Sequence, residues 1–370
     1  MKNDQKKKIV WILLPNLKVG GAEVFLTSLA AELHSRYDFI FFVNDSEAEL
    51  HTPGQTVYTH ANPCHFFYRL IRLSWRQPPD VVLSSIIDMN LIALIIKYVT
   101  PASIKYIVRE ALPLREASSL MRAPKLYLRL AQKLYPKADA IVNLSKPLQR
   151  SLEMTIPGIS NSTKTVVIPN GVTERRMIAN AGAACSSTTI VSIGRLEYQK
   201  GFDALIRAFS VFQTMRPQYI LKIIGEGSEQ TSLEALIAHE SNEKSIQLCG
   251  KLKDPISELA TAAFFVMPSR YEGLSNAMLE ALVNGVPVLA TKRDTSAAEI
   301  ITSRNGVLID SCDDQKILDG LLEMDHRLAL FDRAEIAKSA REEFSIKSSA
   351  KYYQDLIDDI LNSEEPASHR

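Results

Sequence analysis

The 370-residue sequence predicts an α/β protein built from two doubly wound parallel-sheet domains. Short apolar runs alternate with amphipathic stretches, and this alternation indicates a parallel sheet with helices on both faces. The apolar runs are continuous in Val, Ile and Leu, which is typical of parallel strands buried on both sides. The alternation stops once, after residue 172, and then restarts. At roughly 150 residues per domain, the length also favours two domains.

The first series begins with a strand over 7–15 and a helix over 20–35. Five further apolar runs are interpreted as strands, with helical segments between most of them: FIFFVN (39–44), DVVLSSI (80–86), IKYIVRE (104–110), AIVNLS (140–145) and TVVIPNGV (165–172). These residues make up a first domain over 1–172.

Residues 173–185 have no hydrophobic periodicity and many small polar side chains, so we expect a linker there. The second series has strands at TIVSIGR (189–195), YILKIIGEG (219–227), SIQLCG (245–250), AFFVMPS (263–269) and VPVLAT (286–291). Helices are expected between them over Gly201–Met215, Thr231–His239, Pro255–Ala262 and Asn276–Asn284. The second domain is expected over 186–345, followed by a C-terminal helix (Ile346–Leu361) within 346–370.

Composition excludes several classes of protein. The chain is 46% hydrophobic and 23% charged, as in ordinary globular proteins, which excludes a disordered chain, a collagen and a coiled-coil rod. Its four cysteines (64, 185, 249 and 312) lie far apart without a C-x-x-C pair, which indicates reduced thiols rather than disulfides or a zinc site. The apolar runs Ile9–Leu14 and Ile86–Val99 are too short or too interrupted for a signal peptide or a spanning helix. We therefore expect a cytoplasmic protein, free or peripheral to a membrane.

The net charge of +1 hides an asymmetry between the halves. Residues 1–172 contain 21 Lys and Arg against 13 Asp and Glu, a charge of +8, and the remainder carries −7. Such a split indicates that one half contacts a polyanion, either a nucleic acid or an anionic membrane.

Candidate binding residues follow the strands, because open parallel sheets bind ligands outside the carboxyl ends of their strands. Gly20 and Gly21 follow the first strand at a helix start, where backbone amides suit phosphate, although a plain turn explains the pair equally well. Arg195 and Lys200 follow the first strand of the second domain and suit a diphosphate, although solvated surface charges are the commoner case.

The densest signal is MPSRYEGLSNAMLEALVNG, where a strand, a turn and a helix succeed one another. Asn276 fits the N-cap position, and the helix start supplies free N–H groups for phosphate. Glu272 and Glu280 bracket this turn, and carboxylates accept hydrogen bonds from sugar and ribose hydroxyls. The alternatives are helix-dipole compensation for Glu272 and a solvated helix face for Glu280.

The E-G-L-S-N-A-M-L-E-A segment resembles glycosyltransferase family four, as do G-R-L-E-Y-Q-K-G upstream, G-G-A-E near the N-terminus and V-I-P-N-G-V at 167–172. The resemblance implies the GT-B fold, in which two Rossmann-like domains face a cleft. It implies a retaining, nucleotide-sugar-dependent transferase with an acceptor domain first and a donor domain second. In such enzymes a C-terminal helix often packs back across both domains.

The resemblance also implies roles for individual residues. Arg195 and Lys200 would bind the donor diphosphate, Glu280 the ribose and Glu272 the transferred sugar. The other implied donor contacts are backbone atoms of Gly273, Leu274, Ser275 and Asn276, the base-side residues Lys251 and Leu252, and Gly20 and Gly21 from the first domain.

One position departs from the family pattern. Where many members have a His after an N-terminal strand, this chain has Arg109 and Glu110. We assign both to the catalytic site, with a buried structural ion pair as the alternative.

A metal cofactor is not expected, because the sequence has no D-x-D and no H-E-x-x-H. The leaving diphosphate would be neutralised by Arg195, Lys200 and the helix start at Ser275–Asn276. The sequence Gly225-Glu226-Gly227 lacks the third glycine of a dinucleotide fingerprint, which weighs against a nicotinamide oxidoreductase.

A basic stripe is expected on the first domain. Lys125, Arg129, Lys133 and Lys137 recur every four residues on one side of a helix, while Leu128, Leu130, Ala131, Leu134 and Tyr135 face the core. We expect the stripe to contact an anionic membrane, with a solvated helix face as the alternative. Nucleic-acid binding is the competing class, but the basic helices carry mainly Leu and Ala rather than interleaved aromatics.

The expected function is transfer of a hexose or N-acetylhexosamine from a UDP-sugar to a polyprenyl-diphosphate-linked saccharide in bacterial surface polysaccharide or glycan assembly. A small soluble acceptor is the alternative within the same fold. We expect a monomer on the cytoplasmic face of the inner membrane.

Overall fold

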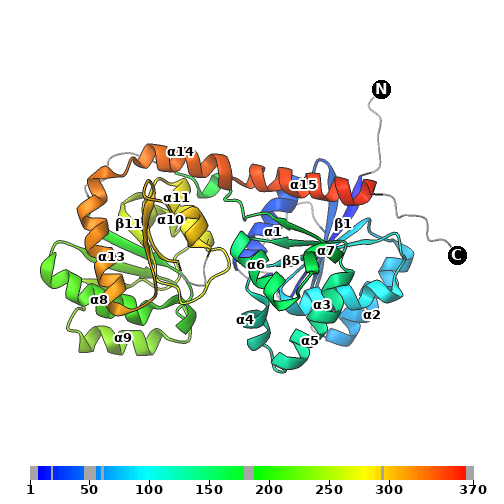
Figure 1. The fold of residues 1–370 in the computed structure, drawn as a ribbon, viewed down its shortest axis with the longest axis horizontal. Coiled ribbons are helices and arrows are strands. Elements are labelled where there is room, and N and C mark those ends of the chain that lie inside the picture. The colour runs from blue at the N-terminus through cyan, green and yellow to red at the C-terminus, as the bar shows by residue number, and fades with distance from the viewer. Residues whose placement is uncertain are drawn as a thin grey trace. The chain divides into compact units, whose positions relative to one another are not determined.

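The computed structural model describes residues 7–17, 20–45, 56–59, 62–178, 187–292 and 296–363. The chain divides into two compact units. Unit 1 comprises residues 1–171 and 346–370, and unit 2 comprises residues 172–345. Each unit contains one parallel sheet with helices on both of its faces (Figure 1).

Unit 1 has a seven-stranded sheet in the order β3-β2-β1-β4-β5-β6-β7, and every pairing is parallel. The strands are β1 (Lys8–Leu14), β2 (Tyr37–Val43), β3 (Thr56–Thr59), β4 (Val81–Ser85), β5 (Lys105–Glu110), β6 (Ala140–Asn143) and β7 (Lys164–Val167). The edge strand β3 was not predicted, because its four residues give no apolar run.

Alternate residues of β1 divide the core of unit 1 into two layers. Val10, Ile12 and Leu14 pack with helices α1 (Gly21–Glu32) and α15 (Ile346–Asn362). Trp11 and Leu13 pack on the opposite face of the sheet. The helices of that second layer are α2 (Pro63–Arg76), α3 (Ile87–Ile96), α4 (Leu114–Ser119), α5 (Pro124–Leu134), α6 (Lys146–Thr155) and α7 (Ile159–Ser162).

Unit 2 has a six-stranded parallel sheet in the order β10-β9-β8-β11-β12-β13. Its strands are β8 (Thr189–Ile193), β9 (Ile220–Ile224), β10 (Ile246–Leu248), β11 (Ala262–Met267), β12 (Val288–Thr291) and β13 (Gly306–Ile309). The helices are α8 (Phe202–Met215), α9 (Gln230–His239), α10 (Ile256–Ala260), α11 (Asn276–Val283), α12 (Ala297–Ile300), α13 (Asp314–Arg327) and α14 (Arg333–Phe344).

Both sheets start at an inner strand and extend to either side, which is the doubly wound order. The direction of winding reverses between β1 and β4 in unit 1 and between β8 and β11 in unit 2. Ligands of open parallel sheets bind at these switch points. A ligand-binding site of unit 2 is therefore expected at the loops that follow β8 and β11.

The expected linker and C-terminal helix differ from the structure in part. Residues Glu174–Arg176 form a 3-10 turn (η3) that belongs to unit 2, and residues 179–185 lie outside the described part. Helix α15 belongs to unit 1, where it packs beside α1. Its Tyr353 is fully buried against Phe25 of α1, with ring centroids 5.9 Å apart.

Candidate functional site

Two loops meet at the switch point of unit 2. The Lys200 loop (194–201) follows β8 and contains a short 3-10 turn over Tyr198–Lys200 (η4), and the Glu272 loop (268–275) follows β11. The Lys200 ammonium forms an ion pair with the Glu272 carboxylate, and only 15% and 11% of the two side chains are exposed. The structure thus brings together two residues predicted for diphosphate and sugar binding.

Arg270 holds these loops together. Its backbone N–H donates to the Gln199 carbonyl at 2.8 Å, and its Nη1 donates to the Tyr198 carbonyl at 2.6 Å. The guanidinium carbon lies 3.9 Å from the centre of the Tyr198 ring, a cation–π contact. In return, the Gln199 side chain donates to the Tyr271 carbonyl at 3.0 Å. Arg270 lies inside the MPSRYEGLSNAMLEALVNG segment, but nothing in its position there predicts that it bridges to the loop after β8.

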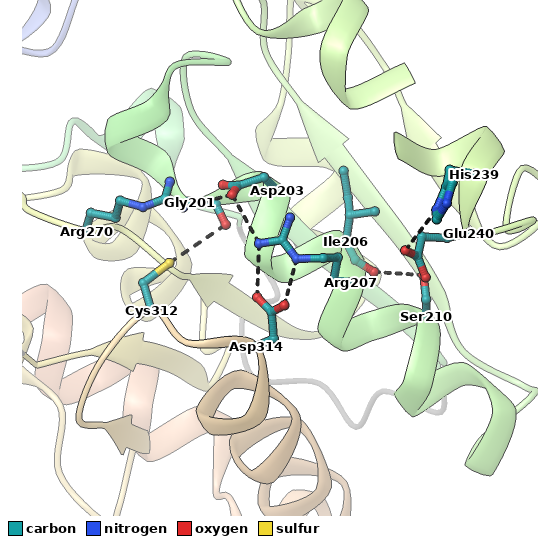
Figure 2. Close-up of polar contacts among 10 residues, drawn as sticks. All are labelled: Gly201, Asp203, Ile206, Arg207, Ser210, His239, Glu240, Arg270, Cys312 and Asp314. Atoms are coloured by element: carbon teal, nitrogen blue, oxygen red, sulfur yellow. Dashed lines mark hydrogen bonds and ion pairs between the residues drawn. The ribbon is translucent and has the colours of Figure 1, made fainter. Parts of the chain in front are cut away.

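An ion-pair network extends from Arg270 toward the helices behind the loops. Arg270 Nη2 lies 2.8 Å from the Asp203 carboxylate, which also pairs with Arg207 at 3.2 Å. Figure 2 shows Arg207 bridging Asp203 and Asp314, and its Nε is 2.6 Å from an Asp314 oxygen. This network anchors the Lys200 loop to α8 and to the start of α13.

Gly201 permits the close approach of the two loops. Its φ of 68° lies in the left-handed region, and a Cβ there would come 2.2 Å from the Pro268 carbonyl oxygen. The Cys312 sulfur would lie 2.5 Å from the same Cβ, and its thiol is 4.0 Å from the Gly201 carbonyl (Figure 2). Burial raises the pKa of Cys312 to about 11, so the thiol stays neutral at physiological pH.

The sequence Gly225-Glu226-Gly227, which lacks the third glycine of a dinucleotide fingerprint, packs on the Lys200 loop. Leu196 N–H donates to the Glu226 carbonyl at 2.9 Å, and Glu229 N–H donates to the Leu196 carbonyl at 2.9 Å. Gly225 N–H in turn donates to the Gly250 carbonyl, next to Lys251. Three consecutive loops at the carboxyl edge of the sheet are therefore joined by backbone hydrogen bonds.

The start of α11 differs by one residue from the prediction. The N-cap is Ser275, whose hydroxyl accepts from the Met278 N–H, and Asn276 is the first helical residue. A Ser side chain reaches an N–H of the first turn as well as Asn does, so the sequence leaves the two equivalent. Gly273, Leu274 and Ser275 are buried beneath the loop surface.

Glu280 is buried inside α11 and pairs with Arg176 from the η3 turn. The Arg176 Nε lies 2.8 Å from Glu280 Oε1, and Nη2 donates to Oε2 at 3.3 Å. Burial raises the pKa of Glu280 to about 7 despite the opposing effect of Arg176. Asn284 completes the contact by donating to the Arg176 carbonyl at 2.9 Å. Glu280 therefore does not lie on a solvated helix face.

The other residues of unit 2 that are predicted to bind the nucleotide sugar lie at or near its surface. Arg195 is exposed, and its charge helps to lower the pKa of Glu197 after the larger effect of the Ser228 hydrogen bonds. Lys251 is exposed and Leu252 half-buried after β10. Arg195 and Lys251 thus follow β8 and β10, the two strands on either side of β9.

Gly20 and Gly21 lie at the start of α1 as expected, but a carboxylate is already there. Gly20 is the N-cap, and Glu23 Oε2 lies 2.3 Å from where a Gly20 Cβ would be. Glu23 is buried. A phosphate can approach Gly20 only after this carboxylate turns away, because two anions repel each other.

Arg109 and Glu110 point to opposite faces of β5, so the alternative of a direct ion pair between them is wrong. Arg109 is fully buried, donates to Ser85 Oγ at 2.8 Å and to Asn170 Oδ1 at 2.5 Å, and lies 5.1 Å from the Phe25 ring centre. Neighbouring residues of a strand face opposite sides of the sheet, which separates the two side chains.

Glu110 accepts hydrogen bonds from the Asn90 amide at 2.9 Å and from the Tyr135 hydroxyl. It is 4% exposed, and burial raises its pKa to about 7. Neither Arg109 nor Glu110 is exposed enough to contact a dissolved ligand in this structure. Their assignment to the catalytic site stays a prediction.

Ile86 is a further unusual residue at the switch point of unit 1. It follows β4 and precedes α3 with φ 75° and ψ 139°, a conformation that β-branched residues rarely adopt. Such strain costs of order 1–3 kcal/mol and is concentrated at functional sites. No sequence signal marks it, since Ile is an ordinary residue after a strand.

The basic stripe is exposed as expected, with one difference. Lys125, Arg129 and Lys133 lie on α5, but Lys137 follows in a 3-10 turn (η2, Tyr135–Lys137), because Pro136 interrupts the helix. The predicted inward residues do pack into the core: Ala131, Leu134 and Tyr135 fully, Leu128 and Leu130 in part.

The described residues include neither a cluster of metal ligands nor a membrane-spanning helix. Those residues contain no group of three or more His, Cys, Asp or Glu side chains placed to hold a metal ion. Within the same part of the chain, no helix is both long enough and apolar enough to cross a bilayer.

Comparison with known proteins assigns the class. Residues 175–343 match the family model of glycosyl transferases group 1. The chain resembles the solved structures of Anabaena HepE with UDP and glucose (TM-score 0.81, 17% identity, 94% of this chain and 99% of that one) and of sucrose-phosphate synthase from Thermosynechococcus elongatus (TM-score 0.81, 15% identity, 97% and 100%). The predicted GT-B class of two Rossmann-like domains is confirmed.

The matched segment, residues 175–343, makes up nearly the whole of unit 2. The chain is 30% identical over 225 residues to the N-acetylgalactosamine-N,N'-diacetylbacillosaminyl-diphospho-undecaprenol 4-alpha-N-acetylgalactosaminyltransferase of Campylobacter jejuni, covering 56% of this chain and 60% of the relative. It is 30% identical over 193 residues to a GDP-mannose-dependent monoacylated alpha-(1-6)-phosphatidylinositol monomannoside mannosyltransferase of Corynebacterium glutamicum, covering 50% of this chain and 49% of the relative. The matches thus span about half the length of these relatives.

Proposed function

We propose that the protein is a retaining glycosyltransferase that moves a hexose or N-acetylhexosamine from a UDP-sugar to a saccharide linked to polyprenyl diphosphate. The observation that carries this proposal is the Lys200–Glu272 pair beside the α11 N-terminus, at the switch point of a group 1 domain. The pair joins a cation suited to diphosphate and a carboxylate suited to sugar hydroxyls. Such a site can bind both ends of the sugar–phosphate bond that breaks.

The residues have separate roles in this proposal. Arg195 and Lys200 neutralise the diphosphate as it leaves, and the positive end of the α11 dipole adds to that stabilisation. Glu272 accepts hydrogen bonds from the transferred sugar, and Glu280 accepts them from the ribose. The acceptor oxygen attacks the face from which the diphosphate departs, and a phosphate oxygen takes the acceptor proton. The anomeric configuration is thereby retained.

The donor and acceptor classes rest on what similar proteins are named for. Anabaena HepE was solved with UDP and glucose, and the Campylobacter jejuni relative acts on an undecaprenol-linked saccharide. The Corynebacterium glutamicum relative is GDP-mannose-dependent, so the first experiment compares donors that differ in their nucleotide base. A polyprenyl-linked acceptor lies in the membrane. The basic stripe would bind unit 1 to the anionic cytoplasmic face of that membrane, next to the acceptor.

A donor screen tests the proposal. UDP-, GDP- and ADP-sugars are incubated with the full chain and a lipid-diphosphate saccharide, and nucleotide release is measured. We expect UDP release that the acceptor stimulates, together with a product of unchanged anomeric configuration by NMR. Release of GDP alone would show that the donor is a GDP-sugar. A product of inverted anomeric configuration would contradict the retaining mechanism. No release with any donor would contradict the proposed function.

Chelation tests the proposed independence from metals. Because Arg195, Lys200 and the α11 N-terminus supply the positive charge, transfer should continue in excess EDTA. The rate is compared in EDTA alone and in EDTA overcome by Mg²⁺ or Mn²⁺. Loss of transfer on chelation and its return with added metal would show that a cation bound with the donor is required.

A further inference from the structure

Helix α2 exposes aromatic and basic side chains on one side. Three residues recur every four positions along the helix: Tyr68, Arg72 and Arg76. Trp75 lies three positions after Arg72, so all four side chains fall within about 100° of the helix surface. The Tyr68 and Trp75 side chains are 59% and 64% exposed. Phe66 and Leu70, on the other side of the helix, are buried in the core.

The exposed patch continues onto the 3-10 turn after α3. In this turn (η1, Lys97–Val99), Tyr98 is 64% and Val99 48% exposed. Trp75 Nε1 donates to the Val99 carbonyl at 2.9 Å, so the polar edge of the indole is satisfied and its apolar ring faces outward. We call Tyr68, Arg72, Trp75, Arg76, Tyr98 and Val99 together the aromatic–basic face.

The charges on this face are of one sign. Neither α2 nor α5 contains an Asp or a Glu. Within the described part of the chain, Arg72 and Arg76 form no ion pair, although each is exposed. An exposed aromatic cluster beside unpaired arginines marks an interaction surface rather than ordinary solvated surface.

The combination fits a lipid bilayer. Trp and Tyr are enriched at the headgroup level, where an apolar ring and a polar edge are both accommodated, and Arg binds phosphate with two parallel hydrogen bonds. Helices α2 and α5 cover the same face of the unit 1 sheet, and α3 contacts both (Figure 1). The basic stripe of α5 thus belongs to the same helical layer as the aromatic–basic face.

We propose that the aromatic–basic face docks on an anionic phospholipid bilayer, with Trp75 and Tyr98 among the headgroups and Arg72 and Arg76 on lipid phosphates. The proposal deepens the membrane part of the proposed function and rests on its membrane-borne acceptor for its purpose. It assigns the apolar part of the contact to α2 and η1, whereas the basic stripe of α5 supplies charge alone.

The two tryptophans give a direct measurement. Trp11 is buried in the core at 2% exposure, so a change of fluorescence on adding vesicles reports Trp75. We expect the emission to shift to shorter wavelength with phosphatidylglycerol-containing vesicles, and brominated lipids to quench it. The shift should be absent in Trp75→Phe, which removes the reporter while keeping an aromatic ring.

Vesicle flotation then separates charge from apolar contact. Arg72→Gln/Arg76→Gln should lower partitioning onto anionic vesicles about thirtyfold, since each basic residue contributes about 1 kcal/mol. Trp75→Ala and, separately, Tyr98→Ala should lower partitioning even at high salt, where the contribution of charge is screened. Tyr98→Ala keeps the Trp75–Val99 hydrogen bond, so its loss of binding cannot be attributed to a disturbed helix.

The matched control is Lys351→Gln/Tyr352→Ala on α15. This pair also combines an exposed basic residue with an exposed aromatic one, but α15 covers the other face of the unit 1 sheet from α2. It should float like the wild type. Equal flotation of the wild type and the aromatic–basic variants would overturn the proposal, as would a wild type that dimerises in solution and loses that dimer with Trp75→Ala.

Turnover of a water-soluble acceptor analogue distinguishes this proposal from the proposed function. The aromatic–basic variants should keep that turnover, because the altered residues lie outside the candidate site. If vesicles bind but no nucleotide sugar is ever turned over, the proposed function fails and the docking surface stands. If turnover is normal and no vesicle binds, the docking surface fails alone.

Discussion

Glu280 is a buried carboxyl group whose charged partner comes from outside its own helix. Because Arg176 approaches it from the η3 turn, Glu280 fixes that turn on α11, and its binding of the donor ribose is a proposal. Arg195 is the opposite case, an exposed side chain that no described ion pair holds in place. The two therefore test donor binding in different ways.

Substitution of either residue should weaken use of the donor. A hydrogen bond to a charged group contributes about 1.5–3 kcal/mol, so Glu280→Ala and Arg195→Ala should each lower kcat/KM roughly ten- to a hundredfold. Steady-state kinetics and nucleotide titration measure this effect. The exposed Arg304 and Glu335 of unit 2 provide control variants, Arg304→Ala and Glu335→Ala, which should retain full activity. Unchanged turnover and affinity in both site variants would remove them from the donor site.

At the scale of elements, the Lys200 loop keeps its shape through contacts made by its neighbours. Gln199 within the loop donates to the Tyr271 carbonyl, and Arg270 and the Asp203–Arg207–Asp314 network outside the loop supply the other polar contacts that fix it. Arg270 is thus a positioning residue for Lys200 and Glu272.

Arg270→Lys should raise the donor KM about tenfold, because a lysine keeps the charge but loses the fork and the flat stacking surface. Arg216→Lys is the matched control. Arg216 also forms a carboxylate pair, with Asp325 at 2.6 Å, in the same unit but at the far end of α8. Both variants should lose some unfolding free energy in urea, but only Arg270→Lys should change KM. Equal KM values in the two variants would reduce Arg270 to a stabilising role.

Element order was predictable, and the edges of elements were not. The inner strands of both sheets are continuous apolar runs, so the sequence predicts them, but the edge strand β3 (TVYT) has no such run and the edge strand β13 (GVLI) has one of only three residues after a glycine. The choice of Ser275 over Asn276 as N-cap depends on one backbone turn that both residues permit. Arg176 lies in the segment expected to be a linker, and Arg270 lies in the densest motif without a role predicted for it, so only the folded chain shows what they contact.

At the scale of the whole molecule, each unit contains a buried carboxyl group whose pKa is about 7, Glu110 in unit 1 and Glu280 in unit 2. In both, burial is the main cause of a pKa of about 7. A folded-state pKa above the unfolded one means that the native state binds the proton more tightly. The stabilisation is complete below the unfolded pKa and is lost as the pH rises through about 7.

Glu110→Gln should therefore flatten the pH dependence of stability. The wild type should lose up to about 3 kcal/mol more unfolding free energy than the variant between pH 5 and 8. Gln keeps an oxygen that can accept from Asn90 and Tyr135, so the variant can fold. Urea unfolding at each pH measures the difference, with Glu335→Gln as an exposed control. Parallel curves for wild type and Glu110→Gln would show that this carboxyl does not titrate in that range.

Unit 1 is built from two segments that are far apart in the sequence, and this determines the order in which the two units can fold during translation. Residues 346–360 complete the α1-side core of unit 1, yet they are translated after all of unit 2. While the nascent chain grows, α1 and the first strands have no Tyr353, Leu356 or Ile357 against them, and that apolar surface stays uncovered. Unit 2 is contiguous and can mature first. Unit 1, although begun earlier, is finished later, and in the interval its open core is a natural substrate for chaperones.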